Sequence, residues 1–196
     1  MTELEKWHRG VVALKEEYGS LAAGLRDELR RYVGRIKALK RSLFLVSQAA
    51  GSLEICRICQ GDCCNGGKNH VTVVDLLVYL SDGKEPFTPR FEREICPYLG
   101  KHGCLMAPEY RPYNCITFIC ERVEDGLGPV EKMGLQEKEK ELRSLYDNLE
   151  RLFDNSFRYG FLRSFERSLF ADPGQMLRGA ALDVNVGALS NGSLLN

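Results

Sequence analysis

Residues 56–64 read Cys-Arg-Ile-Cys-Gln-Gly-Asp-Cys-Cys and open a cluster that holds every cysteine of this 196-residue chain. The eight cysteines are Cys56, Cys59, Cys63, Cys64, Cys96, Cys104, Cys115 and Cys120. None lies among the 55 residues before this cluster or among the 76 residues after it. Thiolates are soft, strongly donating ligands, and eight of them suffice for two metal sites of four sulfurs each. We therefore predict that all eight are metal ligands.

The spacing within the first group indicates how the sulfurs are shared. Two residues separate Cys56 from Cys59, and this spacing is typical of a turn that presents two sulfurs to one metal ion. Cys63 and Cys64 are adjacent, so their side chains diverge. They can serve two different metals or two edges of one cluster, which favours a binuclear site or two neighbouring sites over one simple zinc finger.

The second group is expected to form by local turns. The loop between Cys96 and Cys104 contains Gly100-Lys101-His102-Gly103, a tight reversal that can bring the two thiols together. Four residues separate Cys115 from Cys120, so the two are expected about a helical turn apart and directed toward one centre. The glycine-rich stretches of residues 51–69 predict a loop around the first group.

The cysteine region resembles a known family. The pattern C-x2-C-x3-C-C, then Cys96-Pro97, a short glycine loop, Cys104 and the run 111–115 (Arg-Pro-Tyr-Asn-Cys) is similar to that of the zinc- or iron-chelating cysteine-cluster family. Flagellin lysine N-methylases are similar to that family in the same region. The resemblance covers about residues 56–120, a third of the chain. It implies metal chelation by all eight cysteines, with Arg111 and Pro112 as structural neighbours of the site.

The resemblance leaves the metal and the chemistry open. Zinc and iron, including an iron–sulfur cluster, are both compatible with the thiols. The methylases are much longer proteins, and this chain has no glycine-rich nucleotide loop following a strand. A redox or methyl-transfer enzyme that uses the metal is one alternative function. A zinc-stapled protein-interaction module is another, and the pattern names no catalytic residue.

Several other side chains near the cysteines are candidates for supporting roles. Arg111 is expected to donate hydrogen bonds to a sulfur or to a backbone carbonyl. His70 and His102 are expected to be surface loop residues, since eight thiols leave no need for an imidazole ligand. Three tyrosines are expected to shield the metal from water: Tyr98, Tyr110 and Tyr113.

Composition narrows the class of protein and its partners. Lysine and arginine number 27, aspartate and glutamate also number 27, and the net charge is zero. This balance gives no case for nucleic acid or an anionic membrane as the main partner. The N-terminus is polar and the apolar runs are too short to span a bilayer. We expect a cytoplasmic protein, where clustered cysteines are more often ligands than disulfides.

The segments before and after the cysteines have helical periodicity. Apolar residues recur every seven positions at Leu4, Val11, Tyr18, Leu25, Tyr32, Leu39 and Val46, a seam that suits a helix pair or a homodimeric coiled coil. Thr2 and Glu5 have the form of a capping box, and Gly19-Ser20 can end one helix and cap the next. Thr72 and Asp75 predict the start of a short buried helix.

The whole chain is therefore predicted to be mainly α, with an irregular metal-stapled core between helices. Residues 1–49 form an N-terminal helical or coiled segment and residues 50–122 the cysteine-cluster domain. Residues 123–170 form C-terminal helices whose leucine and phenylalanine face is core, bent near Tyr159-Gly160 and continued by Phe161, Leu162, Phe165, Leu169 and Phe170. Residues 171–196 are expected to be a loosely ordered tail. The predicted function is that of a small metalloprotein, with a protein partner or a homodimer through the N-terminal heptads.

Overall fold

The computed structural model describes residues 1–64, 66–92, 96–154, 156, 159–170 and 175–177. The side chain of Cys63 and most of the predicted tail, residues 171–174 and 178–196, lie outside this description. Helices dominate the described residues, and the strands are a single pair of two residues each. The mainly α class is thus confirmed.

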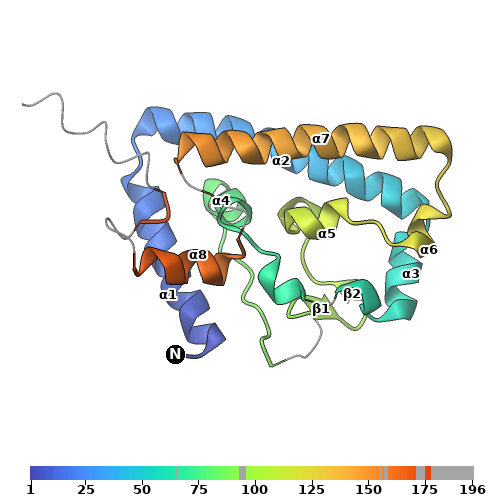
Figure 1. Cartoon of the computed structure of the whole chain (residues 1–196), viewed down its shortest axis with the longest axis horizontal. Coiled ribbons are helices and arrows are strands. Elements are labelled where there is room, and N and C mark those ends of the chain that lie inside the picture. Colours follow the sequence, from blue (N-terminus) through green and yellow to red (C-terminus); the bar gives the residue numbers. More distant parts are fainter. Residues whose placement is uncertain (65, 93–95, 155, 157–158, 171–174, 178–196) are drawn as a thin grey trace, which may run out of the picture.

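Two long helices form the upper layer of the molecule. These are α2 (Ala23–Ala49) and α7 (Pro129–Leu152), which run side by side in opposite directions in Figure 1. Leu29 of α2 and Leu142 of α7 have no exposed surface. Arg35 and Glu141 join the pair at its surface, with Nη2 and Oε1 2.7 Å apart. The predicted heptad residues of α2, Leu25, Tyr32, Leu39 and Val46, are partly buried and pack against the core of the same chain.

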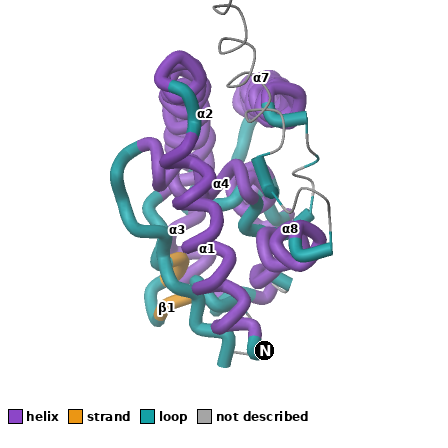
Figure 2. The backbone as a smooth tube through the Cα atoms, turned by 90° about the vertical axis from the view of Figure 1, so that its left-hand side faces the viewer, coloured by secondary structure: helices purple, strands orange, loops and turns teal. Residues whose placement is uncertain are grey.

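A second pair of helices packs at one end of this layer. These are α1 (Glu3–Ser20) and α8 (Phe161–Ser168), which contact each other and lie side by side in Figure 2. Trp7 of α1 lies edge-on to Phe161 of α8, with ring centres 5.2 Å apart. The capping box predicted at the start of α1 is present: the Glu5 amide donates to Thr2 and the Thr2 amide to Glu5.

The short helix α4 (Val73–Ser81) lies between the two pairs and is buried along almost its whole length. Its predicted start is confirmed, because Thr72 and Asp75 form a second capping box. All four valines and leucines from Val73 to Leu77 are inaccessible to solvent or nearly so. This helix separates the α1–α8 end of the molecule from the cysteine region in Figure 1.

Two local predictions about the helices are wrong. Ser20 is the last residue of α1 and does not cap α2, whose N-terminal flank at Ala22 makes no side-chain hydrogen bond. Leu169 and Phe170 are 49% and 90% exposed, because α8 ends at Ser168 before they can turn toward the core. Phe161 and Phe165 are buried as predicted.

The glycine-rich stretches predicted a loop around the first cysteine group, and this prediction is wrong for Cys56 and Cys59. Residues Ser52–Cys59 form helix α3, which follows α2 at a sharp bend. Gly51 makes that bend with a positive φ of 81°, a conformation that side-chain-bearing residues rarely adopt. The glycine thus ends one helix and begins another.

The rest of the cysteine region consists of short turns and helices. In chain order they are η1 (Asp62–Cys64), η2 (Gly67–Asn69), β1 (Leu99–Gly100), β2 (Gly103–Cys104), η3 (Pro108–Tyr110), α5 (Tyr113–Thr117) and α6 (Glu121–Glu124). Strands β1 and β2 pair antiparallel with Leu99 opposite Cys104, which confirms the predicted reversal. Cys115 and Cys120 do not share a helix, because α5 ends at Thr117.

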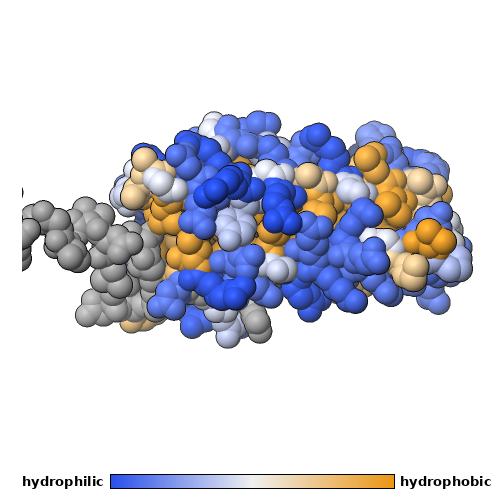
Figure 3. Space-filling model, turned by 90° about the horizontal axis from the view of Figure 1, so that it is seen from above, coloured by the Kyte–Doolittle hydropathy of each residue, from blue (hydrophilic) through white to orange (hydrophobic). Residues whose placement is uncertain are grey.

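The surface above α2 and α7 is mostly hydrophilic (Figure 3). Apolar side chains gather at the right-hand end of that view, where α7 begins with Val130 and Met133 exposed by 74% and 60%. Among the described residues no single helix is long and apolar enough to cross a membrane, although the bent pair of α2 and α3 passes that test when the two are taken together.

Candidate metal centre

A cavity of about 680 Å³ lies below α7, enclosed by α3, α5 and the β1–β2 hairpin. Seven cysteines line it: Cys56, Cys59, Cys64, Cys96, Cys104, Cys115 and Cys120. They come from six different elements or loops that span 65 residues of sequence. The fold therefore brings around one space the cysteines that the sequence pattern had singled out, with the side chain of Cys63 outside the description.

Helix α3 supplies two of these cysteines on the same face. Cys56 and Cys59 are three residues apart, so they are neighbours on the helix surface. The Cys59 thiol lies 3.7 Å from the carbonyl oxygen of Cys56. The turn predicted from the two-residue spacing is thus a helix. Cys120 flanks α6 at its start, and α3 contacts α6.

The hairpin supplies two more cysteines. Cys96 precedes β1 and is buried, whereas Cys104 in β2 is exposed. The amide of Leu99 donates to the carbonyl of Cys96 at 3.1 Å, which closes the turn before the strand. Gly67 of η2 packs on this turn so closely that a Cβ there would lie 2.6 Å from the Cys96 sulfur. Only glycine leaves room for the η2 backbone at this point.

Cys115 of α5 is paired with a histidine. The Nδ1 atom of His70 lies 3.3 Å from the Cys115 sulfur, within hydrogen-bonding reach. His70 was expected to be a surface loop residue, but it is half-buried in the cavity wall. Burial raises the pKa of Cys115, and the neighbouring thiols Cys104 and Cys96 raise it further. Burial lowers the pKa of His70, against an opposing effect of Asp75.

Tyr98 adds a buried polar group to the wall. The side chain is 1% exposed, and its hydroxyl has no hydrogen-bond partner among the described residues. Burial raises the pKa of this phenol, as do Cys96 and Cys115. A buried hydroxyl without a partner is costly, by about 1–3 kcal/mol.

The backbone at Arg111, four residues before Cys115, is held by a buried ion pair. Lys40 of α2 and Asp75 of α4 have no exposed side-chain surface, and their Nζ and Oδ1 atoms lie 2.9 Å apart. Lys40 also donates to the carbonyl oxygen of Arg111 at 2.7 Å. Arg111 in turn donates from Nε to the carbonyl of Met106, at 3.1 Å, one of the two roles expected for it.

The network extends to the capping box and to α7. The hydroxyl of Tyr146 donates to Asp75 Oδ1 at 2.6 Å, and the amide of Thr72 donates to Asp75 Oδ2 at 2.9 Å. Burial raises the pKa of Tyr146, and the Asp75 charge raises it further. The role of Lys40 has no signal in the sequence, since a lysine within an amphipathic helix gives no sign that it is buried.

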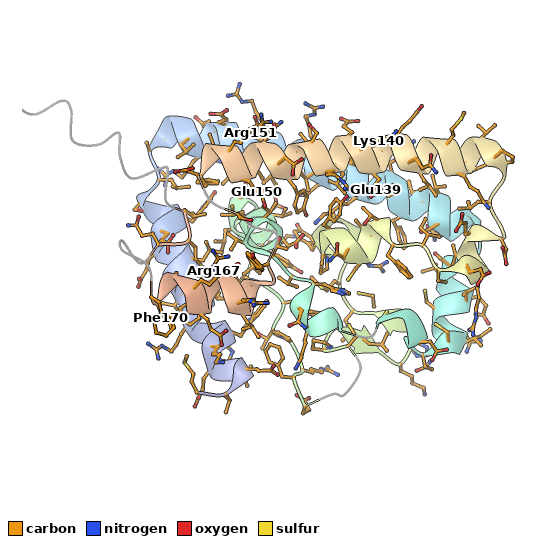
Figure 4. All side chains as sticks on the ribbon, viewed as in Figure 1. Glu139, Lys140, Glu150, Arg151, Arg167 and Phe170 are labelled. Carbon is orange, nitrogen blue, oxygen red and sulfur yellow. The ribbon has the colours of Figure 1, made fainter. Side chains whose placement is uncertain are left out.

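A polar patch forms the upper wall of the cavity. The hydroxyl of Tyr113 donates to Glu139 Oε1 at 3.2 Å, and Arg143 Nη2 donates to the same oxygen at 2.8 Å. Figure 4 shows Glu139 on the side of α7 that faces α5, while Lys140 extends from the outer side. Tyr98 and Tyr113 thus line the cavity, whereas Tyr110 binds Asp82 at 2.5 Å and is not part of the wall.

The cysteines surround the cavity without converging on one point. Within the described part of the chain, no three histidine, cysteine, aspartate or glutamate side chains are placed to hold a metal ion together. His102 lines the cavity from the exposed tip of the hairpin, and His8 lies on the surface of α1. The arrangement is a ring of thiols around a space and not a closed set of four donors.

No family model, curated protein or solved structure matches the chain. The resemblance to the zinc- or iron-chelating family thus rests on the cysteine pattern alone.

Proposed function

We propose that this chain is a metalloprotein that binds iron–sulfur clusters through the cysteines around the cavity. The observation that carries the proposal is that seven cysteines, drawn from separate elements, line one space of about 680 Å³. Hydrophobic packing alone gives no reason to gather so many thiols. Thiolates that face a common space are the ligands of iron–sulfur clusters and of zinc.

The size of the space favours a cluster over a single ion. Zinc needs four donor atoms about 2.3 Å from one point, and therefore sulfurs in mutual contact. The described thiols line the wall of the cavity, and no three of them are set for one ion. A cluster carries its own sulfide and spans a wider gap between ligands.

Anaerobic purification followed by elemental analysis tests this proposal. We expect iron with an equal amount of acid-labile sulfide, and a broad visible absorbance that dithionite bleaches. A Cys96→Ser variant should lose much of that absorbance while its far-ultraviolet circular dichroism stays helical. A matched control is His8→Gln, which changes a surface side chain far from the cavity and should retain the full signal. Zinc in a colourless protein, or no metal after reconstitution with iron and sulfide, would refute the cluster.

The upper wall favours a second candidate function, an enzyme that uses the metal. A cavity of this volume lies in the range of small-molecule sites, about 300–1,000 Å³. Tyr113, Glu139 and Arg143 place hydrogen-bonding and charged groups on its wall. Cyanide added to the loaded protein tests for an iron with an open position. A changed electron paramagnetic resonance spectrum would support this candidate, and an unchanged one would contradict it.

A further inference from the structure

One positive charge on the wall of the cavity has no opposite charge beside it. Of the described lysines, arginines, aspartates and glutamates, those that line the cavity are Arg111, Glu139 and Arg143. Arg143 Nη2 and Glu139 Oε1 lie 2.8 Å apart, so these two charges compensate each other. Arg111 has no carboxylate partner among the described residues, and its side chain contacts a backbone carbonyl and an aromatic ring instead.

The guanidinium of Arg111 is nevertheless held in one orientation. Its Nε atom donates to the carbonyl of Met106 at 3.1 Å, and its Cζ atom lies 4.9 Å from the ring centre of Phe44. The backbone of Arg111 is fixed as well, because its carbonyl accepts from the buried Lys40. Within the described part of the chain, neither Nη atom has a hydrogen-bond partner. A guanidinium that is already oriented loses little freedom when it binds an anion.

The surroundings of this charge are mostly apolar. Phe44 and Met106, which contact Arg111, line the same cavity, as do Leu99 and Ile116. Pockets with such walls take a ligand with an apolar body and use a few polar groups to orient it. One positive charge here matches one negative charge. The second charge of a phosphate monoester would enter an apolar space without a counter-charge, which is costly.

We infer that the cavity binds a small organic monocarboxylate, with its carboxylate on the Nη atoms of Arg111 and its apolar body against Phe44 and Met106. A carboxylate fits this position because its two oxygens can accept two parallel N–H bonds from one guanidinium. The inference goes beyond the proposed function and does not depend on it, since Arg111 is not one of the proposed metal ligands.

Hexanoate and its neutral counterpart hexanamide test this site in the full chain, purified anaerobically. Isothermal titration calorimetry measures the affinities, and nuclear magnetic resonance follows the backbone amides of Met106 and Ile116. Hexanoate should bind saturably, shift these amides, and bind about tenfold more tightly than hexanamide or better, because hydrogen bonds between charged groups are stronger than those between neutral ones. Inorganic phosphate should bind more weakly than hexanoate.

Two substitutions of Arg111 assign the preference to its guanidinium. Arg111→Met should abolish the difference in affinity between hexanoate and hexanamide. Arg111→Lys should keep only part of it, because an ammonium group has no planar fork of donors. The matched control is Arg41→Met, which removes an exposed arginine of α2 that pairs with Glu109 outside the cavity lining and should bind hexanoate as the wild type does. Circular dichroism verifies that each variant is folded.

Three results would overturn the inference: equal binding of hexanoate and hexanamide to the wild type, phosphate binding as tight as that of hexanoate, or an Arg111→Met variant that keeps the preference. The comparison on the wild type decides the matter even if Arg111→Met does not fold. Iron is measured in the same samples, so the two proposals fail separately. Iron-loaded protein that does not bind hexanoate refutes only the carboxylate site, and an iron-free chain that prefers hexanoate refutes only the proposed function.

Discussion

At the scale of single residues, Lys40 and Asp75 form a fully buried ion pair, in which each charge depends on the other for compensation. Both side chains are fully buried, and the hydrogen bonds of Asp75 reach Tyr146 of α7 and Thr72 before α4. A buried ion pair adds little net stability compared with apolar side chains, but removal of one partner leaves an uncompensated charge. The bond from Lys40 to the Arg111 carbonyl also makes the pair a support for the cavity wall.

Lys40→Met should therefore destabilise the protein strongly, by about 3–5 kcal/mol in the free energy of unfolding. The double variant Lys40→Met/Asp75→Asn removes the charge that would be left alone and should recover part of the loss. Urea unfolding followed by circular dichroism measures both. A cost below about 1 kcal/mol for the single variant, or a double variant less stable than the single one, would contradict this account.

At the scale of elements, two glycines in the long helices differ in their surroundings. Gly10 of α1 faces α8, and a Cβ there would lie 2.8 Å from Cζ of Phe161 and 3.0 Å from Cγ of Phe165. Gly34 of α2 is exposed and has no atom within 4 Å of such a position. The first glycine permits a close helix crossing, while the second only weakens its helix.

The same substitution should thus have opposite effects at the two sites. Gly34→Ala should stabilise the protein by about 0.5–1 kcal/mol, because alanine restricts the unfolded backbone and favours a helix. Gly10→Ala should destabilise it by about 1–3 kcal/mol, since the added methyl group must displace buried aromatic rings. Thermal unfolding of the two variants beside the wild type checks the signs. A Gly10→Ala variant that is as stable as Gly34→Ala would mean that α1 and α8 are not packed this closely.

At the scale of the whole molecule, the helical body and the cysteine cavity have different sources of stability. The contacts of Trp7 with Phe161, and the buried leucines of α2 and α7, lie apart from the cavity lining. The cavity is lined mainly by short elements with few residues each, and by one face of α2 and of α7. Metal should therefore order the cavity region more than the helices.

Removal of metal by a chelator should lower the denaturation midpoint but leave most of the helical signal in place. A ligand that binds only the folded state stabilises it by about 4 kcal/mol when its concentration is 1,000 times its dissociation constant. Circular dichroism and urea unfolding of loaded and stripped protein measure the two effects. A stripped chain that loses its helical signal would show that metal staples the entire fold, as the sequence analysis had suggested.

The sequence by itself determined the features that depend on neighbours along the chain. Both capping boxes join residues three apart, Thr2 with Glu5 and Thr72 with Asp75, so their side chains meet whenever a helix starts there. The set of candidate metal ligands was also evident from the sequence, because the thiolate of cysteine is a strong metal ligand in any fold. The helix around Cys56 and Cys59 was not, since a spacing of three suits a metal-binding turn and a helical face equally well.

Only the tertiary structure decided which distant groups meet. Lys40 and Asp75 are 35 residues apart, and His70 and Cys115 are 45 apart. Neither pair has a local signal, because each contact arises from how α2, α4 and α5 pack. The same packing places cysteines of α3, the hairpin and α5 around one cavity. The physical reason is that hydrogen bonds in a helix cap form within one turn of backbone, whereas the surroundings of a cavity depend on the burial of apolar faces throughout the chain.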